Sequence, residues 1–300
     1  MLAARAALAP EDPWLFWNGL RGFTWRSLAQ VADQAARCTR AITVVDEPPA
    51  EPQGIRAPEA PESCSESRPV LGYADRLTPD QIAIDIAAQA AGRLAMAIPV
   101  DDARAPSLGR CAGLWLDGRI GPAVPGSLIR TRRCAVPEVR SAWRSWTLDG
   151  SALEVEGGSS LIEDGSGFLR SISPAQILGL ADRLDGVLPP LPDQPILFSY
   201  RPLSHPDTRA LAAWSLKRGA VWVFEWHRAA WLNAFLWARP HVVCLASEDL
   251  PAFESAMRDR QTRRRSRLKA VVVAGAAGAD RQDSADGAWR RVDFPALSPR

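Results

Sequence analysis

The residues best suited to chemistry lie in the loop Arg201–Asp207, which reads RPLSHPD. His205 carries an imidazole that titrates near neutral pH and could orient a carboxylate. The loop follows an apolar and aromatic run ending at Tyr200, and open α/β sheets bind ligands at the carboxyl ends of their strands. His205, Ser204 and Tyr200 are therefore candidates for a ligand pocket. The alternative is that His205 is a loop histidine hydrogen-bonded to the backbone.

Several other chemistries lack their motifs in this chain. There is no GxSxG nucleophile elbow, which argues against a serine hydrolase, and no GxGxxG fingerprint for a dinucleotide. The five cysteines are scattered and odd in number, with no CxxC pair or Cys/His cluster, so no metal site is expected. Reduced cysteines of this kind are typical of a cytoplasmic protein.

The pocket candidates require a strand, a crossover helix and a second strand to hold them. Residues 195–200 form a short apolar run, and 208–217 has apolar residues close to helical spacing. Arg218 and Gly219 are typical of a helix end, and 220–224 is a second buried strand. This pattern predicts a βαβ unit with parallel strands and a right-handed crossover.

A second βαβ unit is expected between residues 70 and 101. A strand at 69–73 is followed by Thr78 as helix N-cap, Pro79 at the first helical position, and a closing strand at 94–100. The chain is thus predicted to be an α/β protein built from parallel βαβ units. Further strands are expected at 113–118, 143–148, 240–245 and 268–273, helices at 28–42 and 247–260, and a loop-like stretch at 14–22.

Length and composition allow one large or two modest domains. The chain has 300 residues, of which 47% are hydrophobic. We expect an N-terminal α/β subdomain at 1–150, a second α/β subdomain at 151–276 and a polar tail at 277–300. Residues 46–67 are rich in Pro, Glu and Ser, and such a segment cannot bury enough apolar area to offset its ordering entropy. A flexible insertion is therefore expected there.

Charge and hydropathy set limits on partners. The formal net charge of +2 gives no argument for nucleic acid or a membrane surface, and no run approaches the ~20 apolar residues of a membrane span. The N-terminus does not read as a signal peptide. The basic run 258–269 could contact an anionic partner, although a solvated helix end is the simpler interpretation. The twelve tryptophans are expected to fill the core, and an exposed subset would mark an interface.

The loop and its following elements resemble a known family. Pro202, Leu203, Ser204 and His205 match the "PLxH" loop of the adenylate-forming acyl-CoA synthetase superfamily, and residues 219–223 match its "GA-x-V-V" strand. The chain also resembles that family at 23–28, before an alanine-rich helix, and in the strand ending at Ala276. The resemblance covers roughly the N-terminal half of the family and implies the fold of its N-terminal subdomains.

The family uses a Gly/Ser/Thr-rich loop with a lysine to hold the phosphates of ATP. The resemblance places that loop within residues 156–178. Its candidates here are Gly165, Ser166, Gly167 and Arg170. No lysine is present in the segment, and neighbouring acidic residues repel phosphate. ATP and Mg²⁺ are therefore expected as cofactors only if this degenerate loop functions.

The sequence predicts a truncated, degenerate relative of these AMP-binding enzymes, without ligase activity by itself. In this interpretation it keeps an acyl or carboxylate pocket near His205 and acts as a binding or accessory subunit in a homo- or hetero-oligomer. Two alternatives stay open. One is an ATP-dependent acyl-adenylating ligase that uses Arg170. The other is a protein-interaction module that uses the tryptophan surface.

Overall fold

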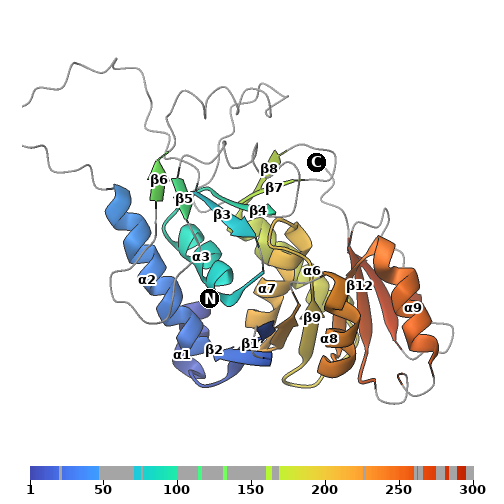
Figure 1. Ribbon diagram of the computed structural model, residues 1–300. Coiled ribbons are helices and arrows are strands. Elements are labelled where there is room, and N and C mark those ends of the chain that lie inside the picture. The colour runs from blue at the N-terminus through green and yellow to red at the C-terminus, as the bar shows by residue number, and fades with distance from the viewer. Residues whose placement is uncertain are drawn as a thin grey trace, which may run out of the picture.

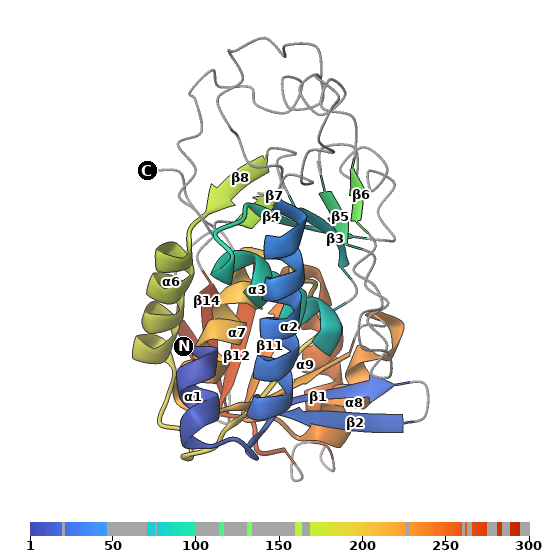
Figure 2. The same ribbon diagram turned by 90° about the vertical axis from the view of Figure 1, so that its left-hand side faces the viewer.

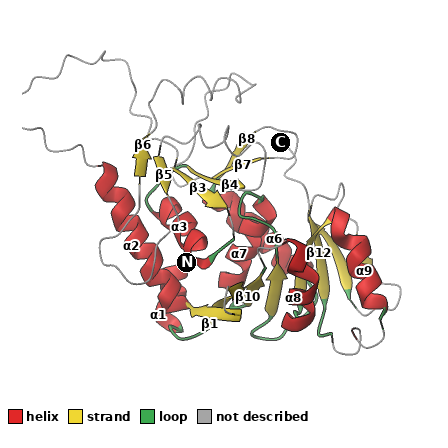
Figure 3. Ribbon diagram, viewed as in Figure 1, coloured by secondary structure: helices red, strands yellow, loops and turns green. Residues whose placement is uncertain are grey.

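A computed structural model describes residues 1–19, 22–46, 71–75, 77–99, 114–116, 131–133, 160–163, 169–225, 228–259, 262, 266–274, 281–283 and 289–294. They form an 8-stranded sheet, the main sheet, and a 6-stranded sheet, the second sheet. Both are mostly parallel, which confirms the predicted α/β class. Figures 1 and 3 show helices α3 (Pro79–Ala90), α6 (Pro174–Val187) and α7 (Pro206–Arg218) between the two sheets.

The predicted βαβ unit around the candidate loop is confirmed. β9 (Ile196–Ser199) leads through α7 to β10 (Val221–Phe224), and the two strands pair in parallel. α7 ends at Gly219, whose φ of 72° lies in the left-handed region. This positive φ favours glycine, and a Cβ at Gly219 would also displace the end of the Arg5 side chain, whose guanidinium would lie 2.3 Å away.

The remaining strands order the main sheet as β13-β14-β12-β11-β9-β10-β1-β2. β11 (Val242–Ala246) and β12 (Ala270–Ala274) pair in parallel, as the sequence predicts, and every residue of each is buried. Strands buried on both faces read as continuous apolar runs, which is why these two are visible in the sequence.

The described residues of the stretch 14–22 are strand, contrary to the loop-like prediction. They belong to β1 (Pro13–Gly19), which pairs in parallel with β10, and to the start of β2 (Gly22–Ser27), which pairs with β1 in antiparallel fashion. The aromatic residues of β1 suit a pleated, half-buried surface, and Trp14 and Leu15 are both buried. Pro13 and Gly19 stand at the strand's two ends.

The predicted polar tail also contributes strands. β13 (Arg281–Asp283) and β14 (Arg290–Phe294) pair with each other, and β14 extends the main sheet in parallel with β12. Only alternate residues of β14, Val292 and Phe294, are buried. A strand with one polar face near a sheet edge has few apolar residues, so its composition resembles that of a tail.

The second βαβ unit is confirmed in the second sheet, whose order is β6-β5-β3-β4-β7-β8. Thr78 caps α3 with a full capping box to Gln81, with Pro79 at the helix start. The predicted insertion beyond Asp46 and the predicted strand at 143–148 lie outside the described residues. The strands are β3 (Leu71–Asp75), β4 (Ala95–Pro99), β5 (Leu114–Leu116), β6 (Thr131–Arg133), β7 (Ser160–Glu163) and β8 (Leu169–Ile172).

Sheet membership crosses residue 150. The main sheet takes β1 and β2 from the expected N-terminal subdomain, and the second sheet takes β7 and β8 from the expected second one. The division into folding units at residue 150 stays a prediction.

Helices cover both faces of the main sheet (Figures 1 and 2). α1 (Leu2–Leu8) and α2 (Leu28–Asp46) pack with the interlayer helices, and α8 (Trp231–Ala238) and α9 (Leu250–Arg258) pack in a second hydrophobic cluster on the other face. The short helices η1 (Arg228–Ala230) and η2 (Ser247–Asp249) precede α8 and α9. No helix in the described part of the chain is long and apolar enough to cross a bilayer.

A buried ion pair joins the layers. Arg209 of α7 donates to both carboxylate oxygens of Asp85 in α3 at 2.5 Å, and also to Ser160 Oγ of β7 at 2.9 Å. Tyr73 Oη of β3 donates to the same carboxylate at 2.5 Å. Burial acts to lower the pKa of Arg209, but the facing Asp85 carboxylate and Tyr73 outweigh it and raise the pKa.

Candidate functional site

The loop Tyr200–His205 lies between β9 and α7, at the carboxyl edge of the main sheet. One nitrogen of the Arg201 guanidinium donates to Asp207 Oδ2 at 2.8 Å, and the other lies 2.9 Å from His205 Nδ1. Asp207 is almost fully buried in the first turn of α7, where the helix dipole favours a carboxylate. These contacts hold the loop as a compact unit with its cation and imidazole side by side.

The contact with Arg201 fixes the tautomer of His205. A guanidinium only donates hydrogen bonds, so Nδ1 must accept and the ring proton is placed on Nε2. Burial, and then the charge of Arg201, lower the pKa of His205, so the ring is neutral at pH 7. No other described residue partners Nε2, which leaves a neutral N–H donor at the carboxyl edge.

We expect the free energy of unfolding to fall as the pH drops below about 6.5. The folded chain has lowered pKa values at His205 and His241, so the unfolded chain takes up protons first. This stability is present above 6.5 and is lost as the pH falls towards the folded pKa values. Urea unfolding at pH 7.5, 6.5 and 5.5 measures it. The His205→Gln variant should show a shallower loss, and an unchanged slope would contradict this origin.

Tyr200 belongs to the other face of the sheet. Its hydroxyl donates to Asp249 Oδ2 at 2.5 Å and accepts from the Ala246 N–H at 2.9 Å, while its ring stacks on Trp231 at 5.4 Å. Burial and the bond to Asp249 raise the pKa of Tyr200. Tyr200 packs with α8 and α9, whereas His205 begins the helix on the opposite face. The hydroxyl therefore joins β9 to the end of β11.

Ser204 directly precedes His205, and its side chain is buried. Arg201 and Asp207, which define the charge of the site, were not among the sequence candidates. The sequence could have indicated them, because an arginine and an aspartate stand on either side of the histidine in RPLSHPD. Cys244 of β11 also reaches this group, with Sγ 3.7 Å from Asp207 Oδ2.

The expected phosphate loop is only partly described. Gly165, Ser166 and Gly167 lie outside the described residues, in the connection between β7 and β8. Those strands form an antiparallel pair, and Arg170 lies in β8 opposite Ile162. The open end of this pair adjoins α7, because Ser160 is bonded to Arg209. Phosphate binding by this segment stays a prediction.

The chain's lysines lie at the other edge of the main sheet. Lys217 stands in the last turn of α7, near the start of β10, and pairs with Asp182 of α6. Lys269 immediately precedes β12. Neither ammonium is therefore placed at the carboxyl edge, next to His205.

Two other kinds of site can be assessed. Within the described ranges, no group of three or more His, Cys, Asp or Glu residues could hold a metal ion. A cavity of about 10 Å³ lies between α1 and the end of α7, lined in part by Arg5, Trp14 and Ser215. It has room for about one water and lies away from the loop, so it is no substrate site.

Solved structures of acyl-CoA synthetases resemble this chain. O-succinylbenzoate coenzyme A synthetase (MenE) from Bacillus subtilis matches with a TM-score of 0.58 and 11% identity, over 92% of this chain and 54% of that one. A Mycobacterium tuberculosis fatty acyl CoA synthetase matches at 0.57 and 15%, with 92% and 54% covered. The N-terminal domain of FACL13 from Mycobacterium tuberculosis matches at 0.59 and 14%, with 92% and 69% covered.

These matches establish the fold. The chain folds like the N-terminal part of acyl-CoA synthetases, which confirms the resemblance read from its sequence. It spans about half the length of the first relatives. MenE has also been solved with an acyl-adenylate intermediate, OSB-AMP. No family model matches the chain, and no curated protein does.

Proposed function

We propose that this chain, with its acyl-CoA-synthetase-like fold, binds a carboxylate or acyl group at the carboxyl edge of its main sheet and forms no acyl-adenylate by itself. The observation that carries this is the 2.9 Å contact between Arg201 and Nδ1 of His205, which leaves the ring proton on Nε2 as a neutral donor. A carboxylate or carbonyl oxygen is the natural acceptor for such a donor, and open α/β sheets bind ligands at this edge.

The second half of the proposal rests on where the cations lie. Adenylation concentrates negative charge on the phosphates of ATP, and that charge must be offset. Lys217 and Lys269 stand at the opposite edge of the sheet, and Arg201 is already paired with Asp207. Arg170 of β8 is the remaining candidate from the sequence.

Calorimetry with carboxylic acids and matched alcohols tests the binding. We expect octanoate or benzoate to bind where octanol and benzyl alcohol do not. The His205→Ala variant should weaken that binding about 10-fold or more, the cost of a hydrogen bond to a charged group. Arg183→Ala, on the exposed face of α6, is the control and should bind as the parent does. Equal binding by His205→Ala would refute the proposed contact.

The absence of ligase activity is tested separately. With ATP, Mg²⁺ and any acid that binds, the chain should release no pyrophosphate. Release would overturn this half of the proposal and favour the alternative ligase. In that case, an Arg170→Ala variant with unchanged turnover would exclude Arg170 as the phosphate partner.

A further inference from the structure

The edge of the main sheet opposite the His205 loop carries a row of basic side chains. β11, β12 and β14 are neighbouring parallel strands, so they begin side by side. The residues at or just before these starts are Arg239, His241, Arg267, Lys269 and Arg290, which we call the basic edge.

Backbone hydrogen bonds hold this row together. The N–H of Lys269 donates to the His241 carbonyl at 2.8 Å, and the N–H of Arg290 donates to the Lys269 carbonyl at 2.9 Å. His241 is anchored in turn, because its Nδ1 accepts from the Ile196 N–H at 2.9 Å. The basic edge is therefore fixed by the sheet itself. Figure 1 shows the starts of these strands facing away from the second sheet.

Much of this positive charge has no carboxylate partner within the described part of the chain. Arg239, Arg267 and Lys269 are exposed, and none of them forms an ion pair with another described residue. These charges act on His241, whose pKa is lowered first by burial and then by Arg267 and Lys269. Positive charge thus accumulates here, in a chain whose formal net charge is only +2.

We propose that the basic edge binds a short acidic segment of a partner protein. Arginine forms paired hydrogen bonds with carboxylates, which suits Arg239 and Arg267. Neighbouring strands are about 4.8 Å apart, so these strand starts span only about 10 Å. That length fits a few acidic side chains, whereas a nucleic acid held through about 6–10 phosphate contacts needs a longer path.

A fluorescein-labelled peptide of ten glutamates tests this proposal by anisotropy at low and physiological salt. The parent protein should bind it at low salt and more weakly as salt rises. The variant Arg267→Glu/Lys269→Glu should lose at least tenfold in affinity. Arg37→Glu/Arg40→Glu on α2 makes the same change in net charge at exposed positions and should stay within about twofold of the parent.

Histidine titration by NMR gives a second readout. Bound carboxylates should raise the pKa of His241, by offsetting Arg267 and Lys269, and leave that of His205 unchanged. The proposal is overturned by no peptide binding at low salt, by equal losses in the two double variants, or by an unmoved His241. It is also overturned if single-stranded RNA of matched charge, or anionic vesicles, bind more tightly than the peptide.

Discussion

The Asp85→Ala variant should lose about 3–5 kcal/mol of its free energy of unfolding, enough to leave much of the chain unfolded at moderate temperature. Asp85 is the carboxylate partner of Arg209, and both side chains are almost fully buried. Its removal leaves a guanidinium inside the protein, with only the hydroxyls of Ser160 and Tyr73 as partners. Urea unfolding, followed by circular dichroism, measures the loss.

Two further variants separate the charge from other effects. Asp85→Leu combined with Arg209→Met replaces the pair by apolar side chains and should recover most of the stability, since it leaves no unpaired charge. Asp33→Ala breaks the exposed pair between Asp33 and Arg37 on α2 and should cost less than about 1 kcal/mol. If Asp85→Ala cost no more than Asp33→Ala, Arg209 would have to reach water in the folded state.

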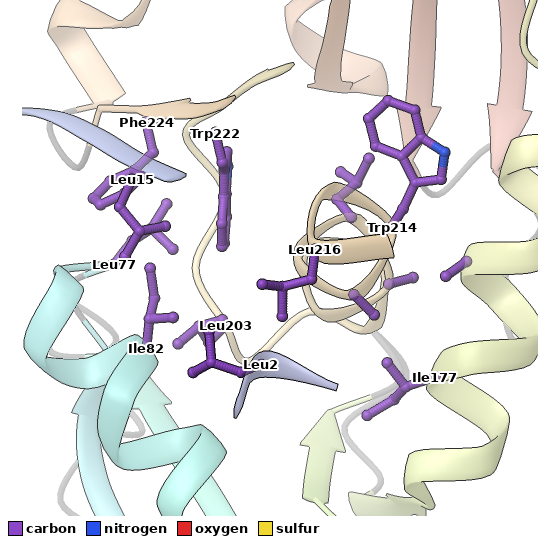
Figure 4. Packing of buried hydrophobic residues seen from close by; sticks show 14 of the residues in the cluster. Leu2, Leu15, Leu77, Ile82, Ile177, Leu203, Trp214, Leu216, Trp222 and Phe224 are labelled. Atoms are coloured by element: carbon purple, nitrogen blue, oxygen red, sulfur yellow. The ribbon is translucent and has the colours of Figure 1, made fainter. Parts of the chain in front are cut away.

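Trp222→Ala should cost about 3–5 kcal/mol, the usual range for emptying a large aromatic site in a core. Trp222 of β10 is fully buried, and its ring lies 5.5 Å from that of Phe224. Figure 4 shows its indole among Leu15 and Phe224 of the main sheet, Leu77 and Ile82 beside the second sheet, and Leu216 of α7. The cavity would therefore open where the two layers meet.

The control is Trp25→Ala on β2, where the side chain is 48% exposed. It removes the same atoms but should cost well under half as much, because less area is buried. Intrinsic fluorescence is unsuited to comparing tryptophan variants, so urea unfolding by circular dichroism is the measurement. Similar losses at the two positions would contradict the central role of Trp222.

Elements with local signals were predictable from the sequence. α3 has Thr78, Pro79 and Gln81 at its start, and α7 ends at Gly219. The start of α3 and the end of α7 are therefore each marked by a few neighbouring residues. β1 and β14 were missed because their strand character depends on partners distant in sequence. β1 pairs with β10, which lies about 200 residues later in the chain, and β14 buries only Val292 and Phe294.

The location of the candidate site was predictable from the sequence, but the side chains that contact one another there were less so. The strand–loop–helix pattern located His205 at a carboxyl edge, because that requires only the order of elements. The contact between Arg201 and Asp207 depends on how the loop folds back, which residue types alone do not fix. Tyr200 follows β9 directly, but strand alternation turns it to the face opposite α7.

Together, the two proposals assign a separate binding function to each edge of the main sheet. The carboxyl edge would hold a small carboxylate near His205, and the amino edge would dock an acidic segment near Lys269. Because the same parallel strands begin at one edge and end at the other, the two tasks can be altered independently by mutation.

The position of β1 in the main sheet has a consequence during synthesis. The buried indole N–H of Trp14 donates to Ser215 Oγ at 2.9 Å, across a sequence separation of 201 residues. At about 5–20 residues per second, the ribosome needs roughly 10–40 s to make the chain between them. Until β10 is made, the edge of β1 that pairs with β10 in the folded chain has no partner strand. Contacts between residues so far apart in sequence favour slow folding.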